Sequence, residues 1–550
     1  MIRSPDPAST ACRLPFLGKI LRFSPERFVE VESCLSLDEA LFLADHLFPF
    51  TPGERAPEGS LAILPLAMSL EAMAEAAACL APGLGWVGFR RVHASRWISV
   101  EEPIRTVLRA ESRPCKASRR PVEVVVSLHP EEQAGAAVSG LALFADRYSA
   151  QISFSFGAVE KGGERSLTGE EAYARGLLFH GPSLRCLVGP LFLGRKIALG
   201  HFLVRPRGGL FRSRPNPELL CDPQLLDGIA QLVALWARRE GRIVFPVGFS
   251  HLEVYGPPPP PGSRLRAGIT IREEKGPILL ANAELVDSRE RSWLRVEGWR
   301  GWSLRLPEKL TDFALSSGSR FLGEPIELSG RSARTAAILL PATAWGDFPE
   351  ELLARGSLQA RELVEWKSLD RPILGRREWL LGRLALKEAL RLLLGSVSPS
   401  SPSPHLRALA LVGERGSAPR LCDAPLASSP HLSLAHASGF ALGAASEAPI
   451  GVDLEPIREP GELLWEALSE EERKAVSSFA KANAQEGFFR LWCAKEAAGK
   501  LFGSGLGRGP RALEARWQGE GDFLVRLRGS GSETVVRTAV REGNVLAWTR

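Results

Sequence analysis

The chain has 550 residues, more than one ordinary hydrophobic core accommodates, so we expect roughly two to four domains. Hydrophobic residues make up 45% and charged residues 24%, which is typical of a soluble globular protein. The net charge is only +6 and no nucleic-acid-binding motif accompanies it, so the small excess of basic residues is all that favours a nucleic-acid partner.

The sequence predicts neither a signal peptide nor a membrane span. The apolar patch at Leu14–Ile20 lacks a proper apolar h-region and a cleavage site. The longest apolar stretch, Leu61–Leu80, contains Glu71 and Glu75, which favours a buried amphipathic helix over a membrane span. The eight cysteines stand far apart without a CxxC pair, so a cytoplasmic protein without a zinc ribbon or a disulfide framework is expected.

The chain before the Gly-, Ser- and Pro-rich segment 305–334 repeats one plan twice. A predicted helix over Pro65–Leu80 precedes one group of strand candidates, and a second predicted helix over Pro223–Arg239 precedes another. The first group includes Trp86–Val92, Val122–Leu128 and Gln151–Phe156, and the second consists of Val244–Val254, Arg264–Ile271 and Leu279–Val286. This order predicts two α+β units, in each of which a sheet wraps a central helix.

Three segments of this half contain residues suited to acid–base chemistry. LADH ends at His46, FHGPSL covers 179–184, and DPQLLDGIAQ contains Asp227 and Gln231 one turn apart on an otherwise apolar helix. A His and an Asp from two repeated units are what loss of water from a β-hydroxyacyl thioester requires. We expect neutral His46 to remove the proton next to the carbonyl. We expect desolvation to raise the pKa of Asp227, so that it protonates the departing hydroxyl.

The part after 334 has a mixed α/β order. A Pro- and Ser-rich run, Ser396–Pro404, predicts a surface loop. The predicted helices are Arg377–Leu394, Ser469–Phe479 and Gln485–Phe502, and the predicted strands are Ala408–Val412, Leu432–Ala435, Ala441–Ala445 and Ile450–Glu455.

Acidic and basic residues cluster in the last of these elements. Asp453 and Glu455 are two apart on a strand and share a face, while Glu496 and Lys500 are four apart on a helix. Three carboxylates offer the hard oxygen ligands that Mg²⁺ prefers together with substrate phosphate oxygens. Lys500 and His436, which ends a strand, can offset pyrophosphate charge.

A further pair of basic residues lies on the predicted helix Arg377–Leu394. Arg383 and Lys387 are four apart and are candidates for additional phosphates.

The segments REWLLGRLALKEAL, HLSLAHASGFALGAA, IGVDLE and LWCAKEAAGK resemble the successive motifs of the surfactin-type 4′-phosphopantetheinyl transferases, over roughly Thr335–Arg550. The resemblance implies a pseudo-twofold pair of α/β halves with coenzyme A between them. It implies that Glu496, or a water it orients, takes the proton from the carrier serine. It also implies that Mg²⁺ binds Asp453, Glu455 and Glu496, that Lys500 and His436 contact the pyrophosphate, and that Arg383 and Lys387 lie on the nucleotide side.

The segments LADH, FHGPSL and DPQLLDGIAQ resemble, in order, the motifs of the double-hotdog dehydratase domain of polyketide synthases, over roughly Pro15–Leu306. That family places a Gly and a Pro soon after the histidine, whereas Gly53 and Pro65 come late here. The variant ending PLAMSLEAMAEAA is more similar to the dehydratases of enediyne and polyunsaturated-fatty-acid synthases. In enediyne synthases, a dehydratase followed by an integral phosphopantetheinyl transferase occupies the end of the chain.

The prediction is a two-part cytoplasmic enzyme of iterative polyketide or fatty-acid biosynthesis. A double-hotdog dehydratase-like domain covers 15–306, a linker 307–334 and an α/β transferase domain 335–550. The expected partners are an acyl carrier protein and other synthase subunits. Two alternatives stay open for the front half: a thioesterase-like hotdog that uses Asp227 and Gln231 with water, and a non-catalytic module that docks the carrier.

Overall fold

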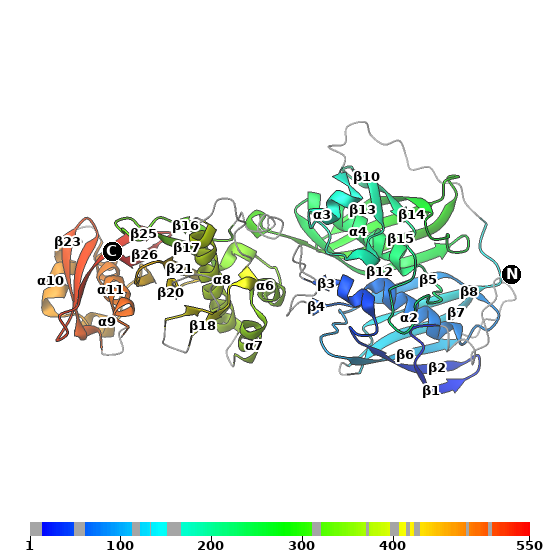
Figure 1. Cartoon of the computed structure of the whole chain (residues 1–550), viewed down its shortest axis with the longest axis horizontal. Coiled ribbons are helices and arrows are strands. Elements are labelled where there is room, and N and C mark those ends of the chain that lie inside the picture. The colour runs from blue at the N-terminus through cyan, green and yellow to red at the C-terminus, as the bar shows by residue number, and fades with distance from the viewer. Residues whose placement is uncertain are drawn as a thin grey trace. The chain divides into compact units, whose positions relative to one another are not determined.

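The computed structural model describes residues 14–48, 61–112, 121–131, 134–150, 167–310, 321–369, 373–395, 406–413, 418–422, 429–479, 483–503 and 509–550. They belong to two compact units, Met1–Arg305 and Leu306–Arg550 (Figure 1). The strand predicted at Gln151–Phe156, the loop predicted at Ser396–Pro404 and Gly53 lie outside the described residues. Within these residues, no helix is long and apolar enough to cross a membrane.

The first unit is built on one large antiparallel sheet. Its strands are β1 (Lys19–Ser24), β2 (Phe28–Leu35), β5 (Gly85–Ala94), β6 (Ile104–Ser112), β7 (Val122–Pro130), β8 (Val138–Ala145), β9 (Leu167–Thr168), β10 (Leu187–Leu193), β11 (Ile197–Leu203), β12 (Arg242–Val254), β13 (Arg264–Lys275), β14 (Ile278–Val286) and β15 (Ser292–Arg305). In space they run in the order β1-β2-β6-β7-β8-β5-β12-β15-β14-β13-β11-β10-β9. The two halves of the sheet therefore join where β5 pairs with β12.

Each half of this sheet wraps one helix. Helix α2 (Leu66–Ala78) contacts β2, β5, β6, β7 and β8, whereas α4 (Pro223–Arg239) contacts β10, β11, β12 and β13. Figure 1 shows α2 in the blue half and α4 in the green half of the unit. Both helices were expected from the sequence, and α4 has the predicted bounds. The repeated arrangement of a sheet around a helix confirms the predicted double-hotdog fold.

Two buried carboxylates of α2 connect distant segments. The carboxylate of Glu71 accepts the backbone N–H groups of Leu220 and Cys221, each at 2.7 Å. The carboxylate of Glu75 accepts the N–H of Phe16 at 2.7 Å. Because buried polar groups require partners, α2 fixes both the segment before β1 and the turn that leads into α4.

Smaller elements lie around the two helices. They are the pair β3 (Leu47–Phe48) and β4 (Leu61–Ala62), the short helix α3 (Gly169–Ala174), and 3-10 turns at Leu41–Asp45 and Pro182–Leu184. Helix α3 begins with a capping box, in which the Thr168 side chain accepts the N–H of Glu171 and the Glu171 carboxylate accepts the N–H of Thr168.

The second unit has two antiparallel sheets, in the orders β16-β17-β21-β20 and β22-β26-β25-β24-β23. The strands are β16 (Glu324–Ile326), β17 (Thr335–Pro341), β20 (His431–Ala437), β21 (Phe440–Ser446), β22 (Val452–Pro456), β23 (Leu513–Gly519), β24 (Asp522–Leu527), β25 (Glu533–Arg541) and β26 (Asn544–Thr549), with a separate pair β18 (Leu411–Val412) and β19 (Arg420–Leu421). The helices are α6 (Glu350–Ser357), α7 (Ala360–Ser368), α8 (Ile373–Gly395), α9 (Glu462–Glu466), α10 (Glu470–Phe479) and α11 (Ala484–Leu501), with 3-10 turns at Ala342–Trp345, Leu406–Ala408 and Pro510–Ala512.

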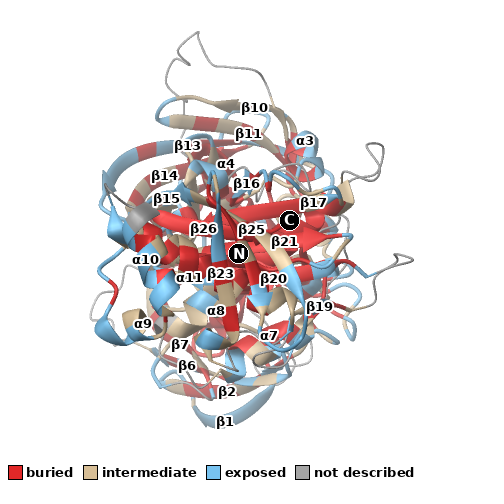
Figure 2. Ribbon diagram, turned by 90° about the vertical axis from the view of Figure 1, so that its left-hand side faces the viewer, coloured by how far each residue is buried: buried red, intermediate tan, exposed pale blue. Residues whose placement is uncertain are grey.

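Each sheet of the second unit is packed against one long helix. Helix α8 contacts β17, β20 and β21, and α11 contacts β22, β23, β24, β25 and β26. In Figure 2, β21 and β26 are coloured almost entirely as buried, in keeping with their position between neighbours. The two sheet-and-helix halves confirm the predicted pair of α/β halves.

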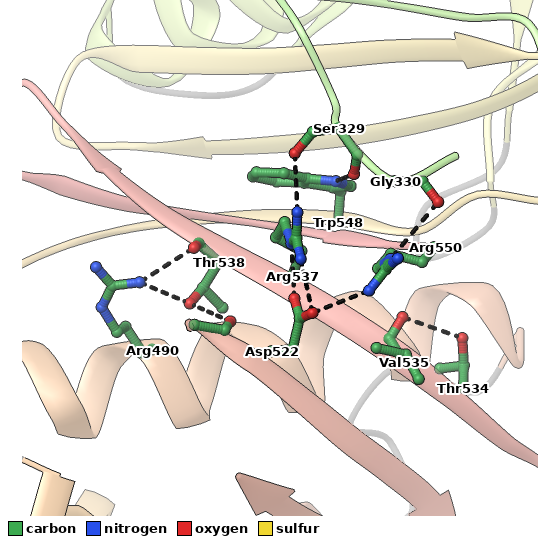
Figure 3. Close-up of polar contacts among 11 residues, drawn as sticks. Ser329, Gly330, Arg490, Asp522, Thr534, Val535, Arg537, Thr538, Trp548 and Arg550 are labelled. Carbon is green, nitrogen blue, oxygen red and sulfur yellow. Dashed lines mark hydrogen bonds and ion pairs between the residues drawn. The ribbon is translucent and has the colours of Figure 1, made fainter. Parts of the chain in front are cut away.

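The segment predicted as a linker, 307–334, is in part a component of the second unit. Leu322 and Gly323 donate their N–H groups to Glu388 of α8 at 2.7 and 2.8 Å, and β16 pairs with β17. Farther on, the Trp548 indole donates to the Ser329 carbonyl at 3.0 Å (Figure 3). These contacts correct the prediction, because residues 322–329 join the sheets of the second unit.

Candidate functional site

In the first unit, three side chains converge although they come from three distant segments. His46 follows the 3-10 turn Leu41–Asp45 and forms an isolated β-bridge with His180, while Asp227 lies in the second turn of α4. Nitrogen or oxygen atoms of the three side chains lie within 4.8 Å of one another. All three residues are buried. The structure thus brings together the predicted pair His46 and Asp227 and adds His180.

The close approach of the two histidine segments depends on Gly181. The Asp45 carbonyl accepts the Gly181 N–H, and the Asp45 carboxylate accepts the Ser183 N–H, both at 2.8 Å. A Cβ at Gly181 would lie 1.9 Å from Asp45 Oδ1, so a side chain at this position would push the segments apart. The LADH and FHGPSL segments therefore form one substructure that sets the position of both imidazoles.

His46 is held as a neutral imidazole. Its Nδ1 lies 2.7 Å from the Ile63 carbonyl, which can only accept, so Nδ1 carries the proton and Nε2 has a free lone pair. Burial lowers the pKa of His46 to about 4, and His180 acts in the same direction while Asp227 opposes it. At neutral pH the ring is therefore able to take up a proton.

Asp227 is the acceptor for two donors. His180 Nε2 lies 3.2 Å from Asp227 Oδ2, and Gln231 donates to the same oxygen at 2.8 Å. Gln231 also donates to the Leu184 carbonyl at 2.9 Å and accepts the Tyr173 hydroxyl at 2.5 Å. The orientation of the carboxylate is therefore fixed from several sides.

The prediction that the pKa of Asp227 is raised is wrong. Burial acts in the predicted direction, but it is outweighed by His180, through its charge and its hydrogen bond, and by the hydrogen bond from Gln231. The pKa of Asp227 lies below its ordinary value, and the group is ionised at neutral pH. The error arose because the apolar helix is visible in the sequence, whereas the contact with His180 is not.

A cavity of about 90 Å³ opens onto these groups, and its walls are mainly aromatic and aliphatic. Phe48 and Phe179 lie with ring centroids 5.7 Å apart, and Trp97 and Phe245 lie 4.8 Å apart. Such walls suit an apolar chain with one polar end at the buried acid–base groups.

In the second unit, β22 and α11 place acidic groups beside Lys500. The Lys500 ammonium donates to Asp453 Oδ1 at 2.8 Å, to the Val452 carbonyl at 2.9 Å and to the Leu434 carbonyl at 3.2 Å. Gly451 permits this approach, because a Cβ there would lie 2.0 Å from the Ala497 carbonyl of α11. Lys500 therefore connects the β20 half of the unit with the β22 half.

The carboxylates around Lys500 carry uncompensated negative charge. Asp453 Oδ2 is buried and has no hydrogen-bond partner among the described residues. Burial and the charge of Asp453 raise the pKa of Glu455. The same two causes, with Glu455 adding to them and Lys500 opposing, raise the pKa of Glu496 to about 7. This donor set fits a divalent cation, although its atoms do not meet within the 4.8 Å that His46, His180 and Asp227 satisfy.

Two basic residues of α8 that were predicted to contact phosphates interact with other groups of the protein. Lys387 is completely buried, forms an ion pair with Glu362 and donates to the Ser357 carbonyl at 2.9 Å. Its assignment to the nucleotide is therefore corrected, because the side chain faces the interior. Arg383 is mostly buried, with its guanidinium 4.6 Å from the Trp379 ring centroid and 3.6 Å from Glu365.

His436 is exposed at the end of β20. It lies two residues after Leu434, whose carbonyl accepts a hydrogen bond from Lys500. This position leaves the His436 side chain accessible from solvent on the strand that Lys500 contacts.

The comparisons with known proteins match both parts of the chain. Residues 449–548 match the 4′-phosphopantetheinyl transferase superfamily, and residues 155–307 match the polyketide synthase dehydratase N-terminal domain. The 4′-phosphopantetheinyl transferase psf-1 of Bacillus pumilus is 32% identical over 109 residues, which are 20% of this chain and 47% of that protein. The chain thus spans about half the length of this relative. The predicted resemblance to both families is confirmed.

Solved structures were also matched. The dehydratase domain from the CurF module of the curacin polyketide synthase has 19% identity and a TM-score of 0.40, covering 53% of this chain and 98% of that chain. A trans-AT polyketide synthase dehydratase domain from Brevibacillus brevis has 17% identity and a TM-score of 0.41, with the same coverage of 53% and 98%.

Proposed function

We propose that the second unit transfers 4′-phosphopantetheine from coenzyme A to a serine of an acyl carrier protein. One observation carries this proposal: buried Asp453 has one oxygen on Lys500 and the other without a partner, beside two further carboxylates of raised pKa. Asp453, Glu455 and Glu496 would hold Mg²⁺. When bound, the ion supplies charge neutralisation for the pyrophosphate.

The residues of the chain would divide the remaining work. Glu496, or a water it orients, takes the proton of the serine hydroxyl as that oxygen attacks the β-phosphorus. The bond to the bridging oxygen breaks and 3′,5′-ADP leaves. Lys500 and the exposed His436 contact the pyrophosphate, for which Lys500 exchanges one of its present acceptors. Arg383 lies on the nucleotide side.

Mass spectrometry of an apo carrier protein incubated with this chain, coenzyme A and Mg²⁺ tests the proposal. Wild type should add the phosphopantetheine mass to the carrier, and Asp453→Ala should not. Glu462→Ala, which changes an exposed carboxylate of the same unit, is the matched control and should behave as wild type. An unmodified carrier with wild type, or full modification by Asp453→Ala, would contradict the assignment.

For the first unit we propose dehydration of carrier-bound β-hydroxyacyl chains. The supporting observation is neutral His46, which has a free Nε2 and lines a mainly apolar cavity together with ionised Asp227. Together the two units would serve iterative polyketide or fatty-acid synthesis with other synthase subunits. A cytoplasmic location is part of this proposal.

Product analysis with a synthetic β-hydroxyacyl thioester separates dehydration from its alternatives. An enoyl thioester indicates dehydration and a free acid indicates a thioesterase-like hydrolase. Unchanged substrate indicates a docking module. His46→Ala should abolish enoyl formation without affecting carrier modification, because the transferase residues lie in the other unit.

A further inference from the structure

The group that protonates the departing hydroxyl remains to be assigned, because Asp227 is ionised. A carboxylate that already accepts hydrogen bonds from His180 and Gln231 has no proton to give. His180 lines the same cavity as His46, and the two ring centroids lie 5.3 Å apart. His180 Nδ1 is buried and lacks a hydrogen-bond partner among the described residues. An unpartnered polar atom in such a place calls for a ligand.

The geometry points to His180 as the catalytic acid of the first unit, with Asp227 as the positioning residue that holds it. This inference rests on the dehydration proposed above and names the proton donor for it. Asp227 lies 3.2 Å from Nε2 and accepts its N–H, so Nδ1 is the nitrogen that can carry the proton delivered to the substrate. The substrate β-hydroxyl would then be the missing partner of Nδ1.

The step balances in atoms and charge. His46 Nε2 takes the proton from the carbon next to the thioester carbonyl, and the released electron pair forms the new double bond. The bond between the β-carbon and its oxygen breaks, and that oxygen takes the Nδ1 proton of His180 and leaves as water. His46 ends protonated and His180 neutral, so proton exchange with solvent restores the starting state.

The surroundings of His180 hold its ring in a fixed position. Asp227 contacts Nε2, neutral His46 lies beside the ring, and Phe179 stacks on it at 4.3 Å between centroids. The Arg185 guanidinium donates to the His180 backbone carbonyl at 2.8 Å, which fixes the main chain. Of the two charged side chains in these contacts, Asp227 touches the imidazole ring, whereas Arg185 touches only the backbone of His180.

A change of leaving group tests the proposal in the full-length protein. One probe is a β-hydroxyacyl thioester, whose β-hydroxyl must be protonated before it can leave as water. The other is the matching β-acetoxyacyl thioester, whose β-substituent leaves as acetate without being protonated. His180→Gln should lower elimination from the hydroxy substrate by a factor on the order of 10² or more. Elimination from the acetoxy substrate should stay within a few-fold of wild type, whereas His46→Gln should lose both reactions.

The outcomes separate the possible roles. Equal losses with both substrates would overturn the proposal, because His180 would then be only structural. The proposal would also be overturned if Asp227→Asn lost elimination from the hydroxy substrate alone while His180→Gln lost none. Asp227 would then be the acid. A smaller loss in Asp227→Asn, again confined to the hydroxy substrate, supports a positioning residue. If wild type converts neither probe, the dehydration itself is refuted.

Discussion

Replacing Glu71 by Gln tests how the turn before α4 is held. Glu71 is fully buried and its two oxygens accept the N–H groups of Leu220 and Cys221. Burial is the largest influence and raises the pKa of Glu71 from 4.5 to about 7, although these two hydrogen bonds oppose it. The pKa of Glu75, one turn later, is also raised, by burial and by the charge of Glu71.

The raised pKa sets the sign of the pH dependence. A carboxyl group whose pKa is higher in the folded state contributes stability that is fully present below the unfolded pKa and lost as pH rises through the folded pKa. The interval from 4.5 to about 7 corresponds to about 3 kcal/mol of unfolding free energy, at 1.36 kcal/mol for each pH unit. Most of it should be lost between pH 5 and pH 8.

Denaturant unfolding followed by tryptophan fluorescence at pH 5 and pH 8 measures this loss. Between the two pH values, wild type should lose about 2–3 kcal/mol relative to Glu71→Gln, with a further contribution from Glu75, whose pKa is raised by burial and, in wild type alone, by the charge of Glu71. The variant should be less stable at pH 5 by about 1–3 kcal/mol, because one backbone N–H loses its acceptor. The lowered pKa of His46 makes stability increase with pH over this range, but His46 is present in both proteins, so its contribution cancels in the comparison. Exposed Glu102→Gln is the control, and identical pH dependence in wild type and Glu71→Gln would refute the reasoning.

Three further predictions concern the second unit. Lys387→Met should lower its unfolding free energy by about 3–5 kcal/mol, because Glu362 is left buried and unpaired, and adding Glu362→Leu should recover much of the loss in thermal denaturation. Lys500→Ala should weaken binding of coenzyme A and of desphospho-coenzyme A equally in calorimetry. Arg383→Ala should weaken binding of coenzyme A more than of the desphospho form, and identical behaviour of these two variants would contradict the nucleotide-side assignment.

The sequence predicted the elements whose pattern is local. Helix α4 was predicted with its observed bounds, from Pro223 to Arg239, and its Pro at the first helical position and arginines in the last turn are local features of the sequence. Spacing alone put Asp453 and Glu455 on one strand and Glu496 and Lys500 on one helix. Strands such as β1, β2, β6 and β8 were missed, because their side chains are sorted by neighbours that only the assembled sheet provides.

Long-range contacts account for the errors in the site. His180 lies in a segment that the sequence had singled out, but its role depends on a bridge to His46 and on Asp227 in α4. The pKa of Asp227 was misjudged for the same reason. Lys387 was given to the nucleotide because its partner, Glu362, lies on another helix and cannot be recognised from spacing.

Two lysines of the second unit show how structure separates a stabilising charge from a functional one. Each forms an ion pair with a carboxylate, and each lies four residues after a candidate site residue on its helix. The Lys387 side chain is 0% exposed and its partner Glu362 2%, so the pair is closed to any ligand. The Lys500 side chain is 29% exposed, and the second oxygen of its partner Asp453 has no hydrogen bond among the described residues. A buried oxygen without a hydrogen-bond donor is costly. The Lys500–Asp453 pair therefore needs a ligand to satisfy that oxygen, whereas the Lys387–Glu362 pair does not.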